Sequence, residues 1–500
     1  MGAGCVVLAI AAGITEAAVL GSEPLTTWGY AAGLAGFFVL GPVVIALYAR
    51  HGEALSLLPA VTGFFLLEFG IGGIFYHRPR LDSVLADLVY TYTSGSVGVA
   101  MILAFASWVL VVVGYQAVRA LDEPIARLPR PQVNDRVTGV AILLIALGWL
   151  ARVVLFSRGW YFHVTGEAAA ESGLRNIVQV LSSLPLLATA MIGARCYRER
   201  PGDAGLFYAL IAVETLWAVP SGGRAQLISL GLALLVVRTY ASPKAFPVGR
   251  AALFAAFAML VVFPLGASYR DIGASSNRYN SDPVGQLSTA ASRMLHQYSV
   301  DPAKAITEGV DQTVQRFAGI TSVAAMANRG TQAYPAEPGE AVVGYAGALV
   351  PRALLPSKAD TSTLTTDFGY RYGIIRPGTI TAVAMTTVGD LWGTFGLAGL
   401  FIGMVIMGGL VRALDQYLRE RRDNYAVLAL YGTVLGSFLL SFETSVAVGF
   451  LQTLRSLVIY VIMIGLAGGT VRVMQGYRPS TVRHRSGPSV ASALGDARRQ

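Results

Sequence analysis

Long apolar runs separated by short polar turns dominate this chain. A helix that crosses the hydrocarbon core of a bilayer needs about 20 predominantly apolar residues, and by that measure the sequence predicts about twelve such segments. They lie near residues 3–20, 27–48, 54–75, 96–118, 137–156, 175–196, 205–219, 225–240, 250–267, 379–411, 425–446 and 450–470. The tenth is long enough for a short re-entrant piece followed by a span. The pattern predicts an all-α fold, a polytopic transmembrane helix bundle.

The spacing of these segments divides the chain into four parts. Residues 1–267 hold the first nine predicted helices, and residues 379–470 hold the last three. Between them lies one long loop, residues 268–378, which is the obvious functional element outside the membrane. Residues 471–500 form a basic tail that we expect to be disordered and cytoplasmic.

The long loop has a helical pattern of its own. Apolar residues recur at helical spacing first at Leu287, Ala291, Met294, Leu295 and Tyr298, and then at Ile306, Val310, Val314 and Phe317. Asp301 followed by Pro302 is a helix start signal for the second set. We therefore expect two amphipathic helices lying on the bundle. The stretches 329–340 and 351–366 are rich in Pro, Gly and Thr and predict irregular chain.

Composition confirms the class of protein. Hydrophobic residues make up 54% of the 500 and charged residues only 13%, whereas soluble domains carry about 25% charged residues. The formal charge of +9 could indicate a nucleic-acid partner. The basic residues fall instead in short turns between apolar segments and in the tail, which is the positive-inside pattern of a membrane protein. We therefore expect a lipid bilayer and no nucleic acid as partner.

The basic turns also predict orientation. With the N-terminus inside, the inner turns contain Arg50, Arg119, Arg127, Arg130, Arg136, Arg195, Arg198, Arg200, Arg238, Lys244, Arg250, Arg412, Arg419, Arg421 and Arg422. This assignment leaves few basic residues outside, so it predicts a multi-pass protein of the inner (plasma) membrane with both termini cytoplasmic. The first segment lacks a basic leader and is expected to be a retained helix. No CxxC or HExxH pattern indicates a metal, and no cofactor is predicted.

The stretch VPSGGRAQLI puts Arg224 where a membrane helix begins. A guanidinium at that depth needs an anionic partner. The flexible turn before it would expose backbone N–H groups at the helix N-terminus, and together with an arginine these favour a phosphate ligand. The alternatives are an arginine that reaches the outer headgroups, or one that pairs with Glu214.

Further cations lie near the outer face in this topology. Arg270 and Arg278 follow the ninth segment and could share a diphosphate with Arg224, because two phosphates need several donors where water is partly excluded. Arg270 could equally be an interfacial anchor paired with Asp271. Arg352 and Lys358 flank a proline-containing turn that could hold both cations toward one anion, or they lie in a solvated loop.

A general base would be a carboxylate or a histidine on the outer face. Five residues qualify by position: His296, Asp271, Glu340, Asp360 and Asp367. His296 could also merely line the polar edge of an amphipathic helix. Seven ionisable residues fall within apolar segments and are either functional or paired between helices, namely Glu16, Glu68, Arg152, Glu214, Asp390, Glu443 and Arg455.

Three motifs carry a resemblance to a known family. They are SGGRAQLI at the start of a helix, GALVPRALLPSK at the end of the long loop, and the glycine-rich GDLWGTFGLAGLFIGMVIMG. Together they resemble the oligosaccharide repeat-unit polymerases, the Wzy-like O-antigen polymerase family. The similarity spans roughly residues 215–415.

The resemblance implies a multi-helix membrane glycosyltransferase that works on the outer leaflet without metal or nucleotide. Its partners would be an undecaprenyl-diphosphate-linked oligosaccharide donor and a second lipid-linked repeat as acceptor, with room for a chain-length regulator. Carried over to this chain, it makes Arg224 and Arg352 ligands of the diphosphate or glycan, with Arg270 as a third. It also gives Trp392, Gly393 and Gly396 a packing role.

The resulting hypothesis is a transfer reaction without an activated nucleotide. Arg224, Arg270 and Arg352 would stabilise the leaving diphosphate, while His296 or Asp271 deprotonates the acceptor hydroxyl. An O-antigen-ligase-like transferase would share this donor site. From other classes, a lipid-linked glycan flippase or secondary transporter would also need intramembrane charges, and a scaffolding membrane protein would tolerate loss of Arg224.

Overall fold

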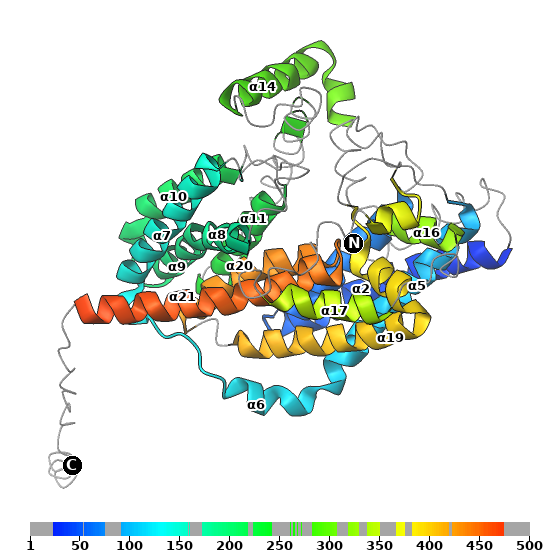
Figure 1. Cartoon of the computed structure of the whole chain (residues 1–500), viewed down its shortest axis with the longest axis horizontal. Coiled ribbons are helices and arrows are strands. Elements are labelled where there is room, and N and C mark those ends of the chain that lie inside the picture. Colours follow the sequence, from blue (N-terminus) through cyan, green and yellow to red (C-terminus); the bar gives the residue numbers. More distant parts are fainter. Residues whose placement is uncertain are drawn as a thin grey trace, which may run out of the picture.

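A computed structural model describes residues 24–53, 55–75, 92–158, 160, 173–218, 224–242, 261, 264–265, 268, 272, 283–307, 319–329, 338–350, 367–375, 383–419 and 423–474. The regular elements in these ranges are all helices (Figure 1). The first half comprises α2 (Pro24–Arg50), α3 (Leu57–Phe65), η1 (Leu66–Ile71), α4 (Gly72–Ile74), α5 (Ser94–Ala117), η3 (Arg119–Leu121), α6 (Asp122–Ala126), η4 (Asn134–Arg136), α7 (Val137–Ser157), α8 (Gly173–Leu181), α9 (Leu184–Arg198), η6 (Pro201–Asp203), α10 (Ala204–Ala218) and α11 (Arg224–Ala241).

The remaining elements are α14 (Pro283–Val300), α16 (Gly319–Arg329), α17 (Pro338–Leu349), α19 (Thr386–Tyr417), α20 (Tyr425–Ser441), η10 (Val446–Leu451) and α21 (Gln452–Met474). Within the described ranges, 7 stretches are long and apolar enough to cross a membrane. These helices agree with the predicted all-α, membrane-type chain. The number twelve stays a prediction, because the segments at 3–20 and 250–267 lie wholly or almost wholly outside the described residues.

The helices form two packed groups (Figure 1). In one, α2, α3, α16 and α19 surround α5; in the other, α7, α9, α10 and α11 pack together. Helices α20 and α21 connect the groups. Helix α20 contacts α3 as well as α9 and α11, and α21 contacts α7 and also α17, which packs against α19 of the first group. A continuous apolar core runs through both groups. The polar cavity described below lies between the second group and the helices α20 and α21.

Glycines allow the closest approach, between α5 and α19. A Cβ on Gly408 would overlap the carbonyl oxygen of Val111, and one on Gly114 would overlap that of Val405. Helices in membranes associate through such small residues, since the backbones can then approach to van der Waals contact without a hydrophobic drive. The two glycines therefore fix how α5 and α19 cross.

The basic turns meet at one end of the bundle. Arg412 of α19 holds Asp122 of α6 through its Nε at 2.7 Å, and Arg198 pairs with Asp423 at 2.9 Å. Asn424 caps α20 by accepting hydrogen bonds from two backbone N–H groups, a common device at helix starts. Hydrogen bonds from Arg412 lower the pKa of Asp122 below its usual range. The positive-inside pattern thus corresponds to one physical end of the molecule, while the side of the membrane that it faces stays a prediction.

The region predicted as the long loop differs from the expectation. Helix α14 confirms the first amphipathic helix, but Figure 1 shows it apart from the bundle rather than lying on it, and Leu295 is exposed. The second predicted helix falls mostly outside the described residues. Helix α16 was not predicted, and it is buried between α5 and α19, with Val323 and Met326 fully inaccessible. Its 11 residues are too few to span a membrane, so the search for apolar segments of membrane length gave no signal for it.

Helix α19 is interrupted, as the length of the tenth apolar segment suggested. Gly396 has φ +70° and ψ −168°, which is a left-handed backbone conformation that favours glycine. The preceding turn is buried, and a Cβ on Gly393 would press on Met326, Phe368 and Tyr372. Gly393 therefore packs closely, whereas Gly396 is required for its backbone conformation, because a Cβ there would meet nothing within 4 Å. The stretch 329–340 also differs, because α17 begins at Pro338 within it.

Candidate functional site

A cavity of about 360 Å³ lies between helices of the second group and the helices α20 and α21. It is reached by the first turns of α11 and α21, the last turns of α7, α10 and α20, and the junction between α8 and α9. Arg238 and Arg472 lie at the other ends of α11 and α21, and Asn424 at the other end of α20. The cavity therefore lies toward the end of the bundle opposite the basic turns.

Most of the residues that line the cavity are polar. It includes ten hydroxyl side chains, from Ser182, Ser183, Ser229, Thr433, Ser437, Ser441, Thr444, Thr453, Ser456 and Tyr460, and three amides, from Gln179, Gln226 and Gln452. Polar groups withdrawn from water cost roughly 1–3 kcal/mol each when they lack hydrogen bonds. Six of the ten hydroxyls donate to a backbone carbonyl three or four residues earlier, as Ser441 does to Ser437 and Ser456 to Gln452. The remaining polar groups of the lining are those that water or a polar ligand would bond here.

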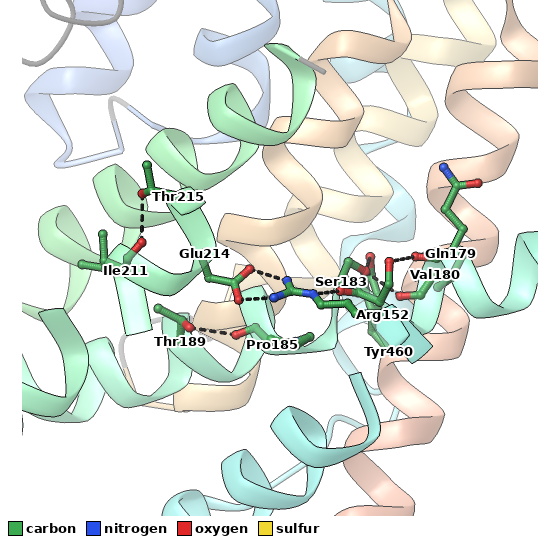
Figure 2. A network of polar contacts seen from close by, with 11 residues as sticks. Arg152, Gln179, Val180, Ser183, Pro185, Thr189, Ile211, Glu214, Thr215 and Tyr460 are labelled. Carbon is green, nitrogen blue, oxygen red and sulfur yellow. Dashed lines mark hydrogen bonds and ion pairs between the residues drawn. The ribbon is translucent and has the colours of Figure 1, made fainter. Parts of the chain in front are cut away.

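Two charged side chains line the cavity, and they bind each other (Figure 2). Arg152 of α7 donates from both terminal nitrogens to Glu214 of α10, at 2.8 and 2.6 Å. Its side chain is 2% exposed and that of Glu214 is 7% exposed. The guanidinium also stacks over the rings of Trp149 and Trp217, at 4.9 and 4.8 Å. The pair is a fork of two parallel hydrogen bonds, the geometry in which arginine binds a carboxylate most strongly.

The Nε of Arg152 binds the backbone where one membrane segment is interrupted between α8 and α9. Helix α8 ends at Leu181 and α9 begins at Leu184, so the carbonyl of Ser182 has no partner within a helix. The Arg152 Nε donates to that carbonyl at 3.0 Å. Nearby, the hydroxyls of Ser183 and Tyr460 are 2.7 Å apart and join the junction to α21 (Figure 2). Interrupted helices that line polar cavities are typical of binding sites within membranes.

Helices α11 and α20 approach closely beside the cavity. A Cβ on Gly436 would lie 2.6 Å from the Cα of Ser229, so only glycine fits there without displacing α11. The close packing leaves the hydroxyl of Thr433 buried, with no hydrogen-bond partner among the described residues. Thr433 is 2% exposed and lines the cavity. A buried hydroxyl without a partner, in the wall of a polar cavity, is a candidate contact for a ligand.

One predicted site residue belongs to a helix that lines the cavity. Arg224 is the first residue of α11, and Gln226 and Ser229 of the same helix line the cavity. The Arg224 side chain lies outside the described residues. The alternative that Arg224 pairs with Glu214 loses support, since Arg152 binds both oxygens of that carboxylate.

Among the other predicted site residues, the two whose side chains the structure describes, His296 and Asp367, do not line the cavity. Arg270, Asp271, Arg278, Arg352, Lys358 and Asp360 lie outside the described residues, as does the side chain of Glu340. His296 is exposed on α14, which stands apart from the bundle (Figure 1). Asp367 is exposed. The predicted cluster of cations at the outer face therefore stays a prediction.

At least three of the seven ionisable residues predicted within apolar segments have partners in the protein. Arg152 and Glu214 pair between helices, as predicted for this set. Asp390 accepts hydrogen bonds from the Tyr345 hydroxyl at 2.7 Å and from the Val446 backbone N–H at 2.8 Å. The remaining members are Glu68 and Glu443, both buried, Arg455, half-buried on α21, and Glu16, outside the described residues.

Sequence reasoning by charge missed the hydroxyl lining. A usable signal was present, because Thr433, Ser437 and Ser441 recur every four residues on α20. Gln452, Ser456 and Tyr460 repeat the same spacing on α21. Residues four apart share one helix face, so each helix carries a polar stripe within an apolar segment. The sequence does not show that the two stripes face the same cavity, because this depends on how α20 and α21 pack against each other.

No protein-family model matches the chain, and neither a curated protein nor a solved structure matches it. Function is therefore inferred from the cavity chemistry and from the sequence motifs.

Proposed function

We propose that the protein is a membrane glycosyltransferase that polymerises undecaprenyl-diphosphate-linked oligosaccharide repeat units into a surface polysaccharide on the outer leaflet. The observation that supports this most is the hydroxyl-lined cavity beside the start of α11, where Arg224 stands. Sugars are recognised through many hydroxyl contacts, and a diphosphate through cations and helix N-termini. Both chemistries adjoin at this one place.

In the proposed reaction, a hydroxyl of the acceptor sugar attacks the anomeric carbon of the donor. The bond from that carbon to the diphosphate oxygen breaks, and undecaprenyl diphosphate leaves. Arg224, with Arg270 and Arg352 and assistance from Arg278 and Lys358, stabilises the developing negative charge. The acceptor proton passes to a general base, for which His296 and Asp271 are the candidates. A role for His296 requires α14 to approach the bundle.

The test is glycan length on the carrier lipid in cells that produce Arg224→Ala, with Arg224→Lys alongside. Polymerisation predicts that single repeats accumulate in the alanine variant while the membrane content of the protein is unchanged, and that lysine restores part of the length. Arg238→Ala is the matched control, since Arg238 lies at the opposite end of α11 and stacks over Tyr197 at 5.0 Å. Unchanged glycan length in a stable Arg224→Ala variant would overturn the proposal.

A second candidate is a lipid-linked glycan flippase or secondary transporter. The interrupted α8–α9 segment beside a polar cavity with a buried ion pair supports it, because transporters place substrate sites at such breaks. Purified protein in liposomes separates the two. A polymerase lengthens lipid-linked repeats that are supplied on its active face, whereas a transporter moves them between leaflets without lengthening. An O-antigen-ligase-like transferase would instead transfer the glycan to a different acceptor.

A further inference from the structure

The cavity offers a ligand no net charge. Arg152 and Glu214 are its charged lining residues within the described chain, and they neutralise each other. Each of the three guanidinium nitrogens donates to a protein acceptor, and each carboxylate oxygen accepts from Arg152. An anionic ligand would find this arginine already occupied, and a cationic ligand would find the carboxylate already occupied. Displacing either partner would leave a buried, uncompensated charge, which is strongly unfavourable.

Neutral hydrogen-bonding groups are available instead. The buried Thr433 hydroxyl has no partner in the described chain. Ser229 on the facing helix lines the same space, as do the amides of Gln226 and Gln452. A hydroxyl both donates and accepts, and an amide presents the two functions side by side. This is the complement of a ligand with several neighbouring hydroxyl groups.

We propose that this cavity binds an uncharged sugar residue of the lipid-linked repeat unit, away from the diphosphate. The proposal rests on the proposed function, and it restricts the substrate class: the sugar bound here carries neither a carboxylate nor an ammonium group. The fork between Arg152 and Glu214 holds the wall in shape and does not bind the ligand's charge. The diphosphate stays at the start of α11, outside the neutral cavity.

Cysteine accessibility tests this directly. Ser456→Cys places a thiol in the cavity wall on α21, in a background with Cys5→Ala and Cys196→Ala. Thr470→Cys on the same helix is the matched control, because it is exposed at the far end of α21. Three methanethiosulfonate reagents, with neutral hydroxyethyl, anionic sulfonatoethyl and cationic trimethylammonioethyl groups, are reacted with each variant in nanodiscs. The neutral reagent should modify position 456 at least about tenfold faster than either charged one, relative to position 470.

Protection by a ligand follows in the same samples. Dodecyl maltoside, a neutral sugar on an alkyl chain, should slow modification at position 456, and dodecyl phosphate should not. Thr433→Val removes the unsatisfied hydroxyl and keeps a similar shape, so it should fold normally and weaken protection about fivefold. Thr470→Val is its control and should leave protection unchanged.

The outcomes are decisive. Equal rates for all three reagents without protection by the maltoside would show a solvent-filled space and overturn the proposal. Faster reaction with the anionic reagent, or protection by dodecyl phosphate, would make the cavity the diphosphate site and overturn it as well. The measurements need no glycan synthesis. If Arg224→Ala fails to shorten glycans, the polymerase proposal is contradicted, while the binding of a neutral sugar in the cavity is unaffected. If the cavity instead shows no preference for neutral ligands, the sugar site is contradicted, while the polymerase proposal is unaffected.

Discussion

Arg152 on α7 and Glu214 on α10 bind each other through two parallel hydrogen bonds while both are shielded from solvent. The same arginine holds the carbonyl of Ser182 at the break between α8 and α9. One side chain thus joins three membrane segments at the wall of the polar cavity. Since an arginine in a bilayer is costly without partners, the fork determines where these helices meet.

Removing one member of this pair should destabilise the protein strongly. Arg152→Ala or Glu214→Ala leaves the other charge buried, and we expect a loss of about 3–5 kcal/mol in the free energy of unfolding. The double variant Arg152→Met with Glu214→Leu replaces both ions by apolar groups and should recover most of that loss. Unfolding in mixed micelles measures all three. Single variants as stable as the parent would contradict a structural role for the pair.

The close contact between α5 and α19 predicts that no side chain larger than that of glycine is tolerated at position 408. Gly408→Ala puts a methyl group into the carbonyl of Val111 and should cost about 1–3 kcal/mol, because backbone cannot move aside as a side chain can. Gly465→Ala is the matched control, since a Cβ there meets nothing within 4 Å. The thermal midpoint of the purified protein should fall for the first variant only. Equal midpoints would show that α5 and α19 cross elsewhere.

Asp390 of α19 accepts hydrogen bonds from Tyr345 of α17 and from Val446 of η10, and so joins these two elements to α19. Tyr345→Phe removes a 2.7 Å hydrogen bond to this buried carboxylate and should lower stability by about 1–3 kcal/mol. Thr394→Val removes a longer contact to the same residue, at 3.4 Å, and should have a smaller effect. Limited proteolysis near α17 should accelerate in the first variant. A larger loss of stability in Thr394→Val than in Tyr345→Phe would mean that Tyr345 is not the main contact between α17 and Asp390.

The basic end predicts a dependence of stability on pH. Arg412 lowers the pKa of Asp122, so the folded state favours the ionised carboxylate. Its contribution is complete above the ordinary value of 3.8 and is lost as the pH falls through the lower folded-state pKa. Asp122→Asn should remove this acid-sensitive part of the stability curve.

Glu123→Gln is the control for that measurement. Glu123 pairs with Arg127 on the surface, where both side chains are 76% exposed, so its contribution should be small. Thermal midpoints recorded from about pH 7 down to about pH 3 compare the variants. A wild-type curve that runs parallel to that of Asp122→Asn over this range would refute the assignment.

The sequence by itself determined the class of protein. Apolar segments of membrane length, short basic turns and few charges predict a helical membrane bundle, because each segment must bury its backbone polar groups within its own helix. The same local rules located the interruption of α19 and the helix α14. They also drew attention to Arg152 and Glu214, since an ion inside an apolar segment stands out without any knowledge of its neighbours.

Only the tertiary structure decided what those residues do. Arg152 and Glu214 are 62 residues apart, and nothing local specifies that they meet each other rather than Arg224. Hydroxyls on α11, α20 and α21 form one cavity only because Gly436 lets α11 approach α20 closely. Burial of α16 depends likewise on the space left between α5 and α19. Helix formation is local and can be read from composition, whereas a cavity depends on the packing of side chains far apart in the chain.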